Sequence, residues 1–349
     1  MKKSPPLTIC IPTYNSSRFL KENLESIVNQ DYTNFEIVIS DNASTDDTEE
    51  IVKSFNNKKI KFFRNPVTIG LTCRNYNERI GEIKTEFIAF YHSDDIYEKE
   101  IARKEVEFLL SHPEASAVFT LGILINEKDK RIGEFQLPEE LRGKELYNFM
   151  DIFRALLKTA ECPIICPTFM ARKKIFEEVG LFDEKRFKRA ADVEMWLRIS
   201  KKYQIGILKE DLIRYRRSST QGSQEYQKLR AESAEKADFF FVMDYYLTNL
   251  KGQIENKLLR QYEYNKNYDE IIRVKYLLIK NNIREAKKIL NKSFSFNLFR
   301  AFFEDFGVKK LKTMVFRIIL FIGVNLGFGR YLGWLLHKRL LYKQEQLKL

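Results

Sequence analysis

The sequence is poor in the residues that cross-link proteins or hold structural metals. Its 349 residues include three histidines and four cysteines. The cysteines are Cys10, Cys73, Cys162 and Cys166. They are too few and too scattered for a disulfide framework. Cys162 and Cys166 lie close together, but no matching Cys or His pair follows to complete a four-ligand zinc site. We therefore expect four reduced thiols packed inside a cytosolic protein.

Several common motifs are missing as well. The basic N-terminus, MKKSPPLTIC, is not followed by a long apolar segment, so we expect no cleaved signal peptide. There is no P-loop and no GxGxxG, which excludes P-loop nucleotide hydrolases and dinucleotide dehydrogenases. The net charge of +12 fits nucleic acid, an anionic membrane or an anionic ligand. No helix-turn-helix, zinc finger or aromatic RNA-binding motif occurs, so we expect no nucleic-acid partner.

The first part of the chain alternates strands with helices. Hydrophobic residues make up 44% of the sequence and charged residues 31%, as in ordinary globular proteins. Short apolar segments predict strands at Leu7–Ile11, Phe35–Ser40, Ile60–Phe63 and Phe87–Tyr91. Helical spacing predicts helices from Ser17 to Val28, from Thr45 or Asp46 through Phe55, and over Tyr76–Ile83. Strands that are apolar throughout indicate a parallel sheet covered on both faces.

Polar loops follow three of these predicted strands. They read PTYN, DNASTDD and HSDD, and the carboxyl ends of parallel strands lie at one edge of a sheet. The last loop places Asp94 beside Asp95, and two like charges need compensation from water, a basic neighbour or a cation. Paired aspartates in a loop are by themselves most often a solvated turn. A second acidic loop at Asp41 favours a hard divalent cation, Mg²⁺ or Mn²⁺, together with a phosphate ligand.

The pattern changes twice further along. From Phe119 onward we expect shorter strands and loops, with a helix that opens near Asp192 and in which Trp196 is a packing residue. A boundary near Ser218–Ser223 separates this part from a helical one. Helices are expected in the segments Gln227–Leu250, Glu255–Tyr264, Asp269–Asn281 and Arg284–Leu290. We therefore predict one domain over 1–222, with halves 1–118 and 119–222, then a helical region over 223–308 and a tail over 309–349.

The N-terminal motifs together resemble a known family. TICIPTYNSSRFLKENLESIVNQDYTNFEIVISDNASTDDT is similar to the opening of the family 2 glycosyltransferases. The segments NPVTIGLTCRNYN, FIAFYHSDDIYEKE, FMARKKIFEEVGLFDE, ADVEMWLRI and LIRYRRSST continue the resemblance in the family's order, from Leu7 to Gly222. The resemblance implies an α/β fold of the GT-A type, a Rossmann-like, mostly parallel sheet flanked by helices. Outside it lies an all-helical C-terminal extension.

The resemblance also implies which residues bind the nucleotide-sugar donor. Pro12 and Tyr14 lie where the family holds the nucleotide base, and Asp41 where an acidic residue reads the base edge. Arg74 lies where a basic residue contacts the nucleotide. Without the family, Tyr14 is as readily interpreted as a packed aromatic residue and Arg74 as a surface cation.

The metal and the catalytic base are implied in the same way. Asp94 and Asp95 lie on the family's DxD-type motif, and we favour Asp95 as ligand of Mn²⁺ or Mg²⁺ with Asp94 nearer the ribose. Asp192 lies on the family's catalytic base. Two departures occur here: His92 replaces an aspartate of the motif, and Ala191 replaces a glutamate before the base. A third departure is Ser218, where the family often has a histidine that contacts phosphate.

The implied reaction is a single displacement with inversion at the sugar, of hexosyltransferase type. A nucleotide-sugar, with a UDP-sugar favoured, would give its sugar to a hydroxyl of a glycan or lipid-linked acceptor in cell-surface polysaccharide synthesis. One alternative is a non-catalytic nucleotide-sugar-binding or scaffold protein with a degenerate site. Another is a nucleotidyltransferase, which is expected to carry a glycine-rich basic loop that IPTYNSSRFL does not provide.

The C-terminal tail predicts attachment to a membrane surface. Between Arg317 and Arg330 it is apolar except for Asn325, which is too short a run to span a bilayer comfortably. The cations of the tail are Lys309, Lys310, Lys312, Arg317, Arg330, Lys338, Arg339, Lys343 and Lys348, against Glu345 alone. We expect an interfacial helix, peripheral at the inner face of the plasma membrane, that brings the site to a lipid-linked acceptor. The alternative is a helix packed on the catalytic domain.

Overall fold

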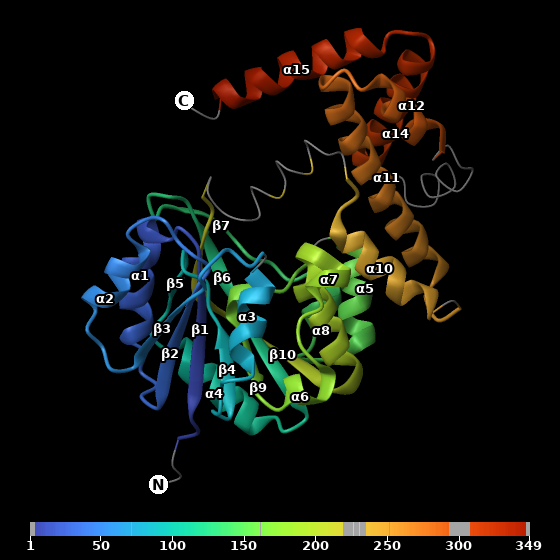
Figure 1. Ribbon diagram of the computed structural model, residues 1–349. Helices are drawn as coiled ribbons and strands as arrows, with labels where there is room; N and C mark the ends of the chain where they lie inside the picture. Colours follow the sequence, from blue (N-terminus) through green and yellow to red (C-terminus); the bar gives the residue numbers. More distant parts are fainter. Residues whose placement is uncertain are drawn as a thin grey trace. The chain divides into compact units, whose positions relative to one another are not determined.

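A computed structural model describes most of the chain as two compact units. It describes residues 4–70, 72–160, 162–218, 226, 230, 235–250, 252–292 and 308–346, with side chains at the C-terminal end from 310 to 339. The first unit comprises Met1–Leu156 with Glu161–Ser218, and the second comprises Leu157–Ala160 with Ser219–Leu349 (Figure 1).

The first unit is built on one mixed sheet. Its strands are β1 (Leu7–Thr13), β2 (Phe35–Asp41), β3 (Ile60–Arg64), β4 (Phe87–Phe90), β5 (Ile96–Tyr97), β6 (Ala115–Ile125), β7 (Arg131–Glu134), β8 (Leu146–Tyr147), β9 (Phe169–Arg172) and β10 (Gln204–Arg216). The order across the sheet is β3-β2-β1-β4-β9-β6-β10-β5, with β7 beside β6 and β8 beside β10. Strands β1 to β4 are mutually parallel, whereas β9 is antiparallel to both its neighbours.

Helices surround this sheet. They are α1 (Ser17–Val28), α2 (Thr48–Ser54), α3 (Thr72–Ile80), α4 (Ile101–Ser111), α5 (Phe149–Thr159), α6 (Ile175–Val179), α7 (Glu184–Phe187) and α8 (Ala191–Lys202), with short 3₁₀ turns at Glu139–Leu141, Cys166–Thr168 and Lys188–Ala190. The helices predicted over 45–55 and 76–83 are present but shifted. Helix α2 begins only at Thr48, because Asp46 accepts hydrogen bonds from the backbone and hydroxyl of Thr48. Helix α3 begins at Thr72 and ends at Ile80.

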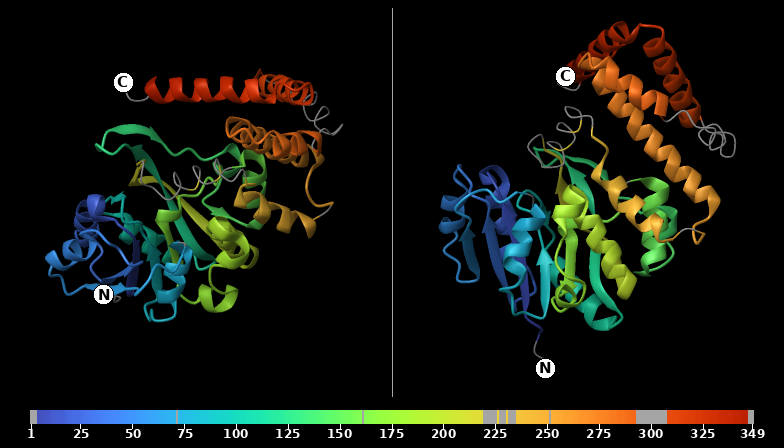
Figure 2. Two further views of the ribbon diagram at one scale, coloured as in Figure 1. Left: turned by 45° about the horizontal axis from the view of Figure 1, so that its top comes forward. Right: turned by 45° about the vertical axis from the view of Figure 1, so that its right-hand side comes forward.

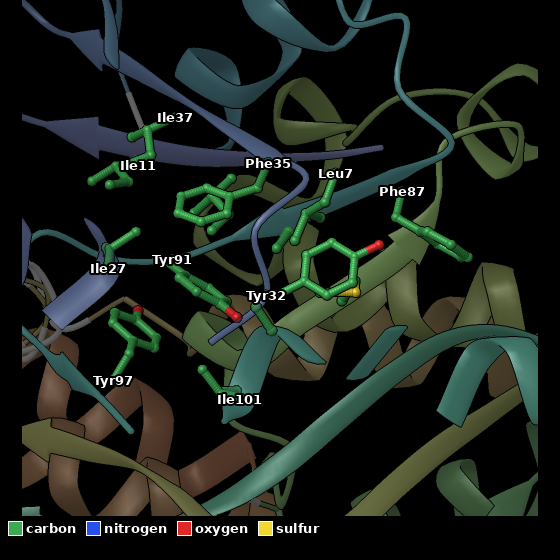
Figure 3. Packing of buried hydrophobic residues seen from close by; sticks show 14 of the residues in the cluster. Leu7, Ile11, Ile27, Tyr32, Phe35, Ile37, Phe87, Tyr91, Tyr97 and Ile101 are labelled. Atoms are coloured by element: carbon green, nitrogen blue, oxygen red, sulfur yellow. The ribbon is translucent and has the colours of Figure 1, made fainter. Parts of the chain in front are cut away.

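Both faces of the sheet are buried, and strand β4 shows why its whole length is apolar. Phe87 and Ala89 belong to a cluster that includes Ile27 of α1 and Ile101 of α4, and Figure 3 labels Phe87, Ile27 and Ile101. Side chains alternate along a strand, so Phe90 faces the other way. There its ring lies 4.3 Å from that of Tyr76 on α3, between ring centroids. The predicted parallel sheet with helices on both faces is confirmed.

The second half of the first unit differs from the sequence prediction. Strand β6 covers 11 residues and β10 covers 13, so the strands after 118 are longer than predicted. The two run parallel along most of their length, which buries β6 between β9 and β10. The boundary at 118/119, predicted between the two halves, falls inside β6. Trp196 is 1% exposed and packs on Phe169, so its interpretation as a packing residue is confirmed.

The described part of the second unit is helical. Its helices are α10 (Asp238–Thr248), α11 (Asn256–Ile279), α12 (Ile283–Lys292), α14 (Val308–Asn325) and α15 (Gly329–Gln346). Helix α11 is continuous where the sequence predicted two helices, over 255–264 and 269–281. The predicted start of a helix at 227 lies outside the described residues. No helix among the described segments is both long enough and apolar enough to cross a membrane.

Helices α11, α12, α14 and α15 share one core (Figures 1 and 2). Leu278 of α11 and Leu320 and Val324 of α14 are among its buried residues. Helix α15 lies so close to α11 that a Cβ atom at Gly333 would stand 2.1 Å from the carbonyl oxygen of Leu278, so a larger residue there would force the helices apart. The tail therefore packs within the helical unit over part of its surface.

One cation of the tail has a role that the sequence did not predict. Arg317 is 1% exposed and ion-pairs with Glu270 of α11 at 3.3 Å. It also donates a hydrogen bond to the side-chain oxygen of Asn267 at 3.0 Å. Burial lowers the pKa of its guanidinium. Counting Arg317 among the cations that face a membrane is therefore wrong, because it joins α14 to α11.

Candidate active site

The ends of β1 and β2 are fixed together by Asp41. The register pairs Thr13 with Asp41, and the Thr13 hydroxyl donates a hydrogen bond to Asp41 Oδ1 at 2.8 Å. The backbone N–H of Ser44 donates to Asp41 Oδ2 at 2.9 Å, and Arg64 Nε lies 3.8 Å from the same oxygen. Asp41 is fully buried. The carboxylate therefore holds the loop after β2 in place, and its contact with a nucleotide base stays a prediction.

The other three residues predicted to contact the nucleotide differ in exposure. Tyr14, just after β1, is 55% exposed, so it is not a packed aromatic residue. Pro12 is half-buried within β1, beside Ser40 of β2. The side chain of Arg74 on α3 is 52% exposed, and its Nε lies 3.9 Å from a carboxylate oxygen of Glu184. Tyr14 and Arg74 are therefore accessible to a ligand.

The loop after β4 gathers three groups with metal-ligand chemistry. One ligand atom from each of His92, Asp94 and Asp95 lies within 4.8 Å of the others. Within the described part of the chain, His92 Nε2 and Asp95 Oδ2 are buried without a hydrogen-bond partner. Burial and the neighbouring charge of Asp94 both raise the pKa of Asp95. Two carboxylates and an imidazole fit Mn²⁺, and the two carboxylates alone fit Mg²⁺, so a divalent cation suits this group.

Helix α1 holds this loop from one side. The side-chain amide of Asn23 donates hydrogen bonds to the carbonyl oxygens of His92 and Asp95, each at 2.7 Å. The hydroxyl of Tyr97 accepts a hydrogen bond from the backbone N–H of His92 at 2.6 Å. The hydroxyls of Ser16 and Ser93 lie 2.9 Å apart. The backbone of the loop is thus fixed by groups that are not themselves metal ligands.

Strand β10 holds the loop from the other side through Arg216. Its backbone N–H donates to Asp95 Oδ1 and its Nε to the carbonyl oxygen of Asp94, both at 2.8 Å. The guanidinium ion-pairs with Glu22 at 2.8 Å and with Asp129, and it lies 4.4 Å from the centroid of the Phe19 ring. Arg216 is 1% exposed. A buried cation of β10 therefore lies directly behind the paired aspartates and connects them to α1 and to the loop after β6.

Asp192 occupies the first turn of α8. Its Oδ1 accepts a hydrogen bond from the backbone N–H of Val193 at 2.7 Å, and the N-terminus of a helix favours an anion. Cys166 donates a thiol hydrogen bond to the same carboxylate. Removal from water nevertheless raises the pKa of Asp192 from 3.8 to about 6. A carboxylate with that pKa is mostly ionised at neutral pH and accepts a proton more readily than an ordinary aspartate does.

Tyr76 of α3 lies beside both groups. Its ring centroid is 6.5 Å from that of His92, and the charges of Asp192 and Cys166 are among the causes that raise the pKa of its phenol, after burial. The hydroxyl of Tyr76 is buried and has no hydrogen-bond partner among the described residues. Helix α3 thus places the Tyr76 side chain near both the loop after β4 and the start of α8.

Comparison with known proteins supports the family resemblance found in the sequence. Residues 8–180 match the sequence model of Glycosyl transferase family 2. The chain belongs to glycosyltransferase family 2. An uncharacterized glycosyltransferase of Methanocaldococcus jannaschii is 28% identical over 217 residues, which are 61% of this chain and 71% of the relative. One of Haemophilus influenzae is 28% identical over 242 residues, 68% of this chain and 73% of the relative.

Solved structures show that this glycosyltransferase has the GT-A fold. The 1–349 structure of S. aureus TarS is similar with a TM-score of 0.51 and 18% identity, over 93% of this chain and 91% of that one. A longer TarS structure is matched over 49% of its length, with a TM-score of 0.50 at 19% identity and 91% of this chain covered. A mannosyltransferase of Pyrobaculum calidifontis is similar with a TM-score of 0.50 and 14% identity, over 97% of this chain and 87% of that one.

The structure of this glycosyltransferase adds residues to the site that sequence reasoning missed. Asn23 had a visible signal: it is a polar residue at helical spacing with the buried Leu20, Leu24 and Ile27. The signal for Arg216 was weaker, a charged residue at the end of an apolar strand. Tyr76 and Cys166 gave none, because a buried tyrosine or cysteine is ordinary packing.

Proposed function

We propose that this glycosyltransferase is a metal-dependent, inverting enzyme that uses a nucleotide-sugar donor, with a UDP-sugar favoured. The observation that supports this most directly is the group of His92, Asp94 and Asp95 after β4, in which His92 Nε2 and Asp95 Oδ2 are buried without a hydrogen-bond partner among the described residues. Two proteins of similar fold agree with it. S. aureus TarS has been solved in complex with UDP, and the Pyrobaculum mannosyltransferase with GDP-Man and Mn²⁺.

Asp192 serves as the general base in this proposal. The acceptor hydroxyl attacks the anomeric carbon from the side opposite the departing nucleoside diphosphate, and its proton passes to the Asp192 carboxylate. A single displacement needs one carboxylate on the acceptor side, in contrast to the two of a retaining hydrolase. The hydrogen bonds from Val193 and Cys166 orient that carboxylate.

The donor side uses the loop after β4 and the exposed residues near it. His92, Asp94 and Asp95 would hold Mn²⁺ or Mg²⁺, which supplies positive charge to the diphosphate leaving group. Tyr14 offers an exposed ring for the base, beside Pro12, and Arg74 a cation for the nucleotide. Asp41 keeps the loop after β2 in position for the base edge. Asn23 and Arg216 fix the loop so that the ligand atoms are already in place.

The acceptor is proposed to be a hydroxyl of a glycan or lipid-linked molecule, in cell-surface polysaccharide synthesis. The support comes from the second unit. Val315, Ile319 and Ile322 of α14 and Leu326 just after it are exposed and recur every three or four residues, so they form one stripe. Phe328, Tyr331, Trp334 and Leu335 are also exposed, in or just before α15. We name these eight residues the apolar stripe.

Contiguous exposed apolar residues flanked by cations are typical of proteins that bind the surface of a membrane. Arg330 and Lys338 lie on α15 with the apolar stripe, and both are exposed. We therefore propose peripheral attachment at the cytoplasmic face of the plasma membrane, where a lipid-linked acceptor is in reach.

One assay tests the enzymatic proposal against both alternatives. The purified chain is incubated with a panel of nucleotide-sugars and Mn²⁺, and release of nucleoside diphosphate is measured with and without a membrane lipid extract as acceptor. A glycosyltransferase releases nucleoside diphosphate in a donor-specific way, and chelation with EDTA stops the release. A nucleotidyltransferase would form inorganic diphosphate instead. Donor binding without any turnover across the panel would favour the non-catalytic binding protein.

A further inference from the structure

Helices α11, α14 and α15 line a partly open cavity of about 430 Å³ within the second unit. Its wall combines two kinds of side chain. Apolar groups come from all three helices: Ile272 and Ile279 of α11, Phe316 of α14 and Leu336 of α15. Cationic groups do too: Lys275, Lys312 and Arg339. No acidic side chain lines the cavity among the residues that the structure describes.

This combination narrows the class of ligand. Lys312 and Arg339 come from two different helices, and with no acidic side chain among the described residues of the wall they create a positive potential that attracts an anion. A free inorganic anion would gain nothing from the apolar part of the wall, and a neutral hydrocarbon would gain nothing from the cations. A molecule with a phosphate at one end and a hydrocarbon chain at the other uses both.

The cavity also lies next to the apolar stripe. Around α14, which turns by about 100° per residue, the cavity residues Lys312 and Phe316 lie between two other sets of side chains. On one side are Val315 and Ile319 of the apolar stripe, and on the other side is the buried Leu320. On α15, Leu335 of the apolar stripe is followed directly by Leu336 of the cavity wall. A lipid that binds the apolar stripe is therefore close to the cavity, because the two surfaces are adjacent on the same helices.

We infer that the cavity between α11, α14 and α15 binds a phosphate-bearing membrane lipid. The phosphate contacts Lys312 and Arg339, and part of an acyl chain lies against Ile279, Phe316 and Leu336. Access to lipid in the cell rests on the proposed membrane attachment, but binding of the lipid in the cavity does not. The apolar stripe lets the protein bind a bilayer of any composition, whereas the cavity binds lipids with an anionic headgroup in preference to others.

The test uses lipids that are monomeric in solution, so that membrane partition plays no part. Dihexanoyl phosphatidic acid, dihexanoyl phosphatidylcholine and inorganic phosphate are each titrated calorimetrically into the full chain. We expect one site for phosphatidic acid, and affinities at least about tenfold weaker for the other two, since each lacks one of the two recognised parts. Equal affinity for inorganic phosphate, or for phosphatidylcholine, would overturn the proposal.

Matched charge reversals locate the site. Lys312→Glu with Arg339→Glu should weaken phosphatidic acid binding about tenfold or more, because two contacts to the charged phosphate are lost. Arg330→Glu with Lys338→Glu reverses two exposed cations of α15 that do not line the cavity, and this variant should bind like the unmodified protein. Equal weakening in both variants would show a diffuse charge effect and overturn the site. Thermal unfolding of each variant checks that α14 and α15 remain packed.

Sedimentation separates the two proposals. Vesicles of phosphatidylcholine with phosphatidylglycerol are mixed with the unmodified chain and with Ile319→Asn/Ile322→Asn, which alters only the apolar stripe. We expect the stripe variant to lose vesicle binding and to keep its calorimetric affinity for dihexanoyl phosphatidic acid. Loss of both in a folded stripe variant would overturn a separate lipid site. An unmodified chain that never sediments refutes the membrane attachment, while the titration alone decides the cavity.

Discussion

Arg216 and Asp95 are 121 positions apart in the sequence, yet the backbone N–H of Arg216 donates to the Asp95 carboxylate at 2.8 Å. The Arg216 side chain lies against the same loop through the carbonyl oxygen of Asp94. One residue at the end of β10 therefore contacts both aspartates of the proposed metal site. The geometry of that site depends on a strand far from the DxD-type motif.

Replacing Arg216 should loosen this loop. Arg216→Ala is expected to lower the free energy of unfolding by about 2 kcal/mol, because several buried hydrogen bonds to charged groups are lost. Arg214→Ala is the control, since its ion pair with Glu98 is half-exposed and worth about 0.5 kcal/mol. Urea denaturation measures both. Indistinguishable midpoints for the two variants would contradict the role given to Arg216.

The metal site should depend on His92 as well as on Asp94. His92→Ala and Asp94→Asn are each expected to weaken Mn²⁺ binding by about tenfold or more. Substituting a residue that only orients a metal ligand already lowers metal affinity by about that factor, so removing a ligand should lower it at least as much. Electron paramagnetic resonance of free Mn²⁺ gives the affinity, and Glu98→Gln on the nearby surface is the control. Unchanged binding in His92→Ala would leave the two aspartates as the ligands.

Asp95 lies in a loop that is by itself most often a solvated turn, yet its side chain is fully buried. Its carbonyl oxygen accepts a hydrogen bond from Asn23, and its carboxylate accepts one from the backbone N–H of Arg216. Asp95→Ala is therefore expected to lower stability as well as metal-dependent donor binding.

Asp192→Asn should reduce turnover by roughly two to four powers of ten, the usual contribution of a positioned general base. The amide has almost the shape of the carboxylate but does not accept the proton. Donor affinity, measured by calorimetry with Mn²⁺, is expected to stay within about twofold, because the proposed role of Asp192 is to take the proton of the acceptor. Near-normal turnover at saturating acceptor would remove Asp192 from the mechanism.

The pH dependence should follow the pKa of Asp192, about 6. The base works only when ionised, so turnover rises with pH up to about 6 and then levels off. The Cys166 thiol lowers this pKa through its hydrogen bond, so Cys166→Ala should move the acidic limb of the profile to higher pH. A limb unmoved in the variant argues against that hydrogen bond.

The raised pKa of Asp192 affects folding stability in the opposite direction from turnover, because turnover increases and stability decreases as the pH rises. The pKa of Asp192 is higher in the folded protein than its ordinary value of 3.8. Protonation therefore favours the folded state. The stabilising contribution is complete below the unfolded value and disappears as the pH rises through about 6.

Membrane attachment should depend on the apolar stripe. Ile319→Asn with Ile322→Asn is expected to reduce sedimentation with anionic vesicles by about tenfold or more, since each isoleucine contributes more than 1 kcal/mol when it leaves water. Ile132→Asn is the control, an exposed isoleucine of β7 in the first unit. Truncation before Lys309 is a poorer test, because it removes Leu320 and Val324 from the helical core. Full sedimentation of the stripe variant would refute attachment through this surface.

The sheet could be predicted because its strands are recognisable one at a time. The segments Leu7–Thr13, Phe35–Asp41 and Phe87–Phe90 are almost wholly buried, and burial on two faces leaves a local signature, an apolar run with a polar loop after it. Helix α11 was harder to predict, since polar residues near Asn265 suggested a break. No glycine or proline interrupts it, and packing carries the helix through.

The residues of the candidate site differ in the same way: some could be predicted from a local pattern, and others are brought together only by the fold. The paired aspartates are adjacent in sequence and could be recognised there. The partners of Arg216 come from α1, from the loop after β4 and from the loop after β6, and no local pattern connects them. His92 was interpreted as a departure from the family motif, whereas the fold brings it within reach of both aspartates. Long-range placement of this kind depends on the whole topology.

The order of synthesis follows from where β10 lies in the chain. A ribosome makes β1 to β4 and the loop with Asp94 and Asp95 well before it reaches Arg216. During that interval the loop lacks the cation behind it and the N–H donor for Asp95. The proposed metal site is completed only when the last strand is added between β6 and β5. The full set of contacts around Asp94 and Asp95 is thus available only late in translation, after nearly all of the first unit has been synthesised.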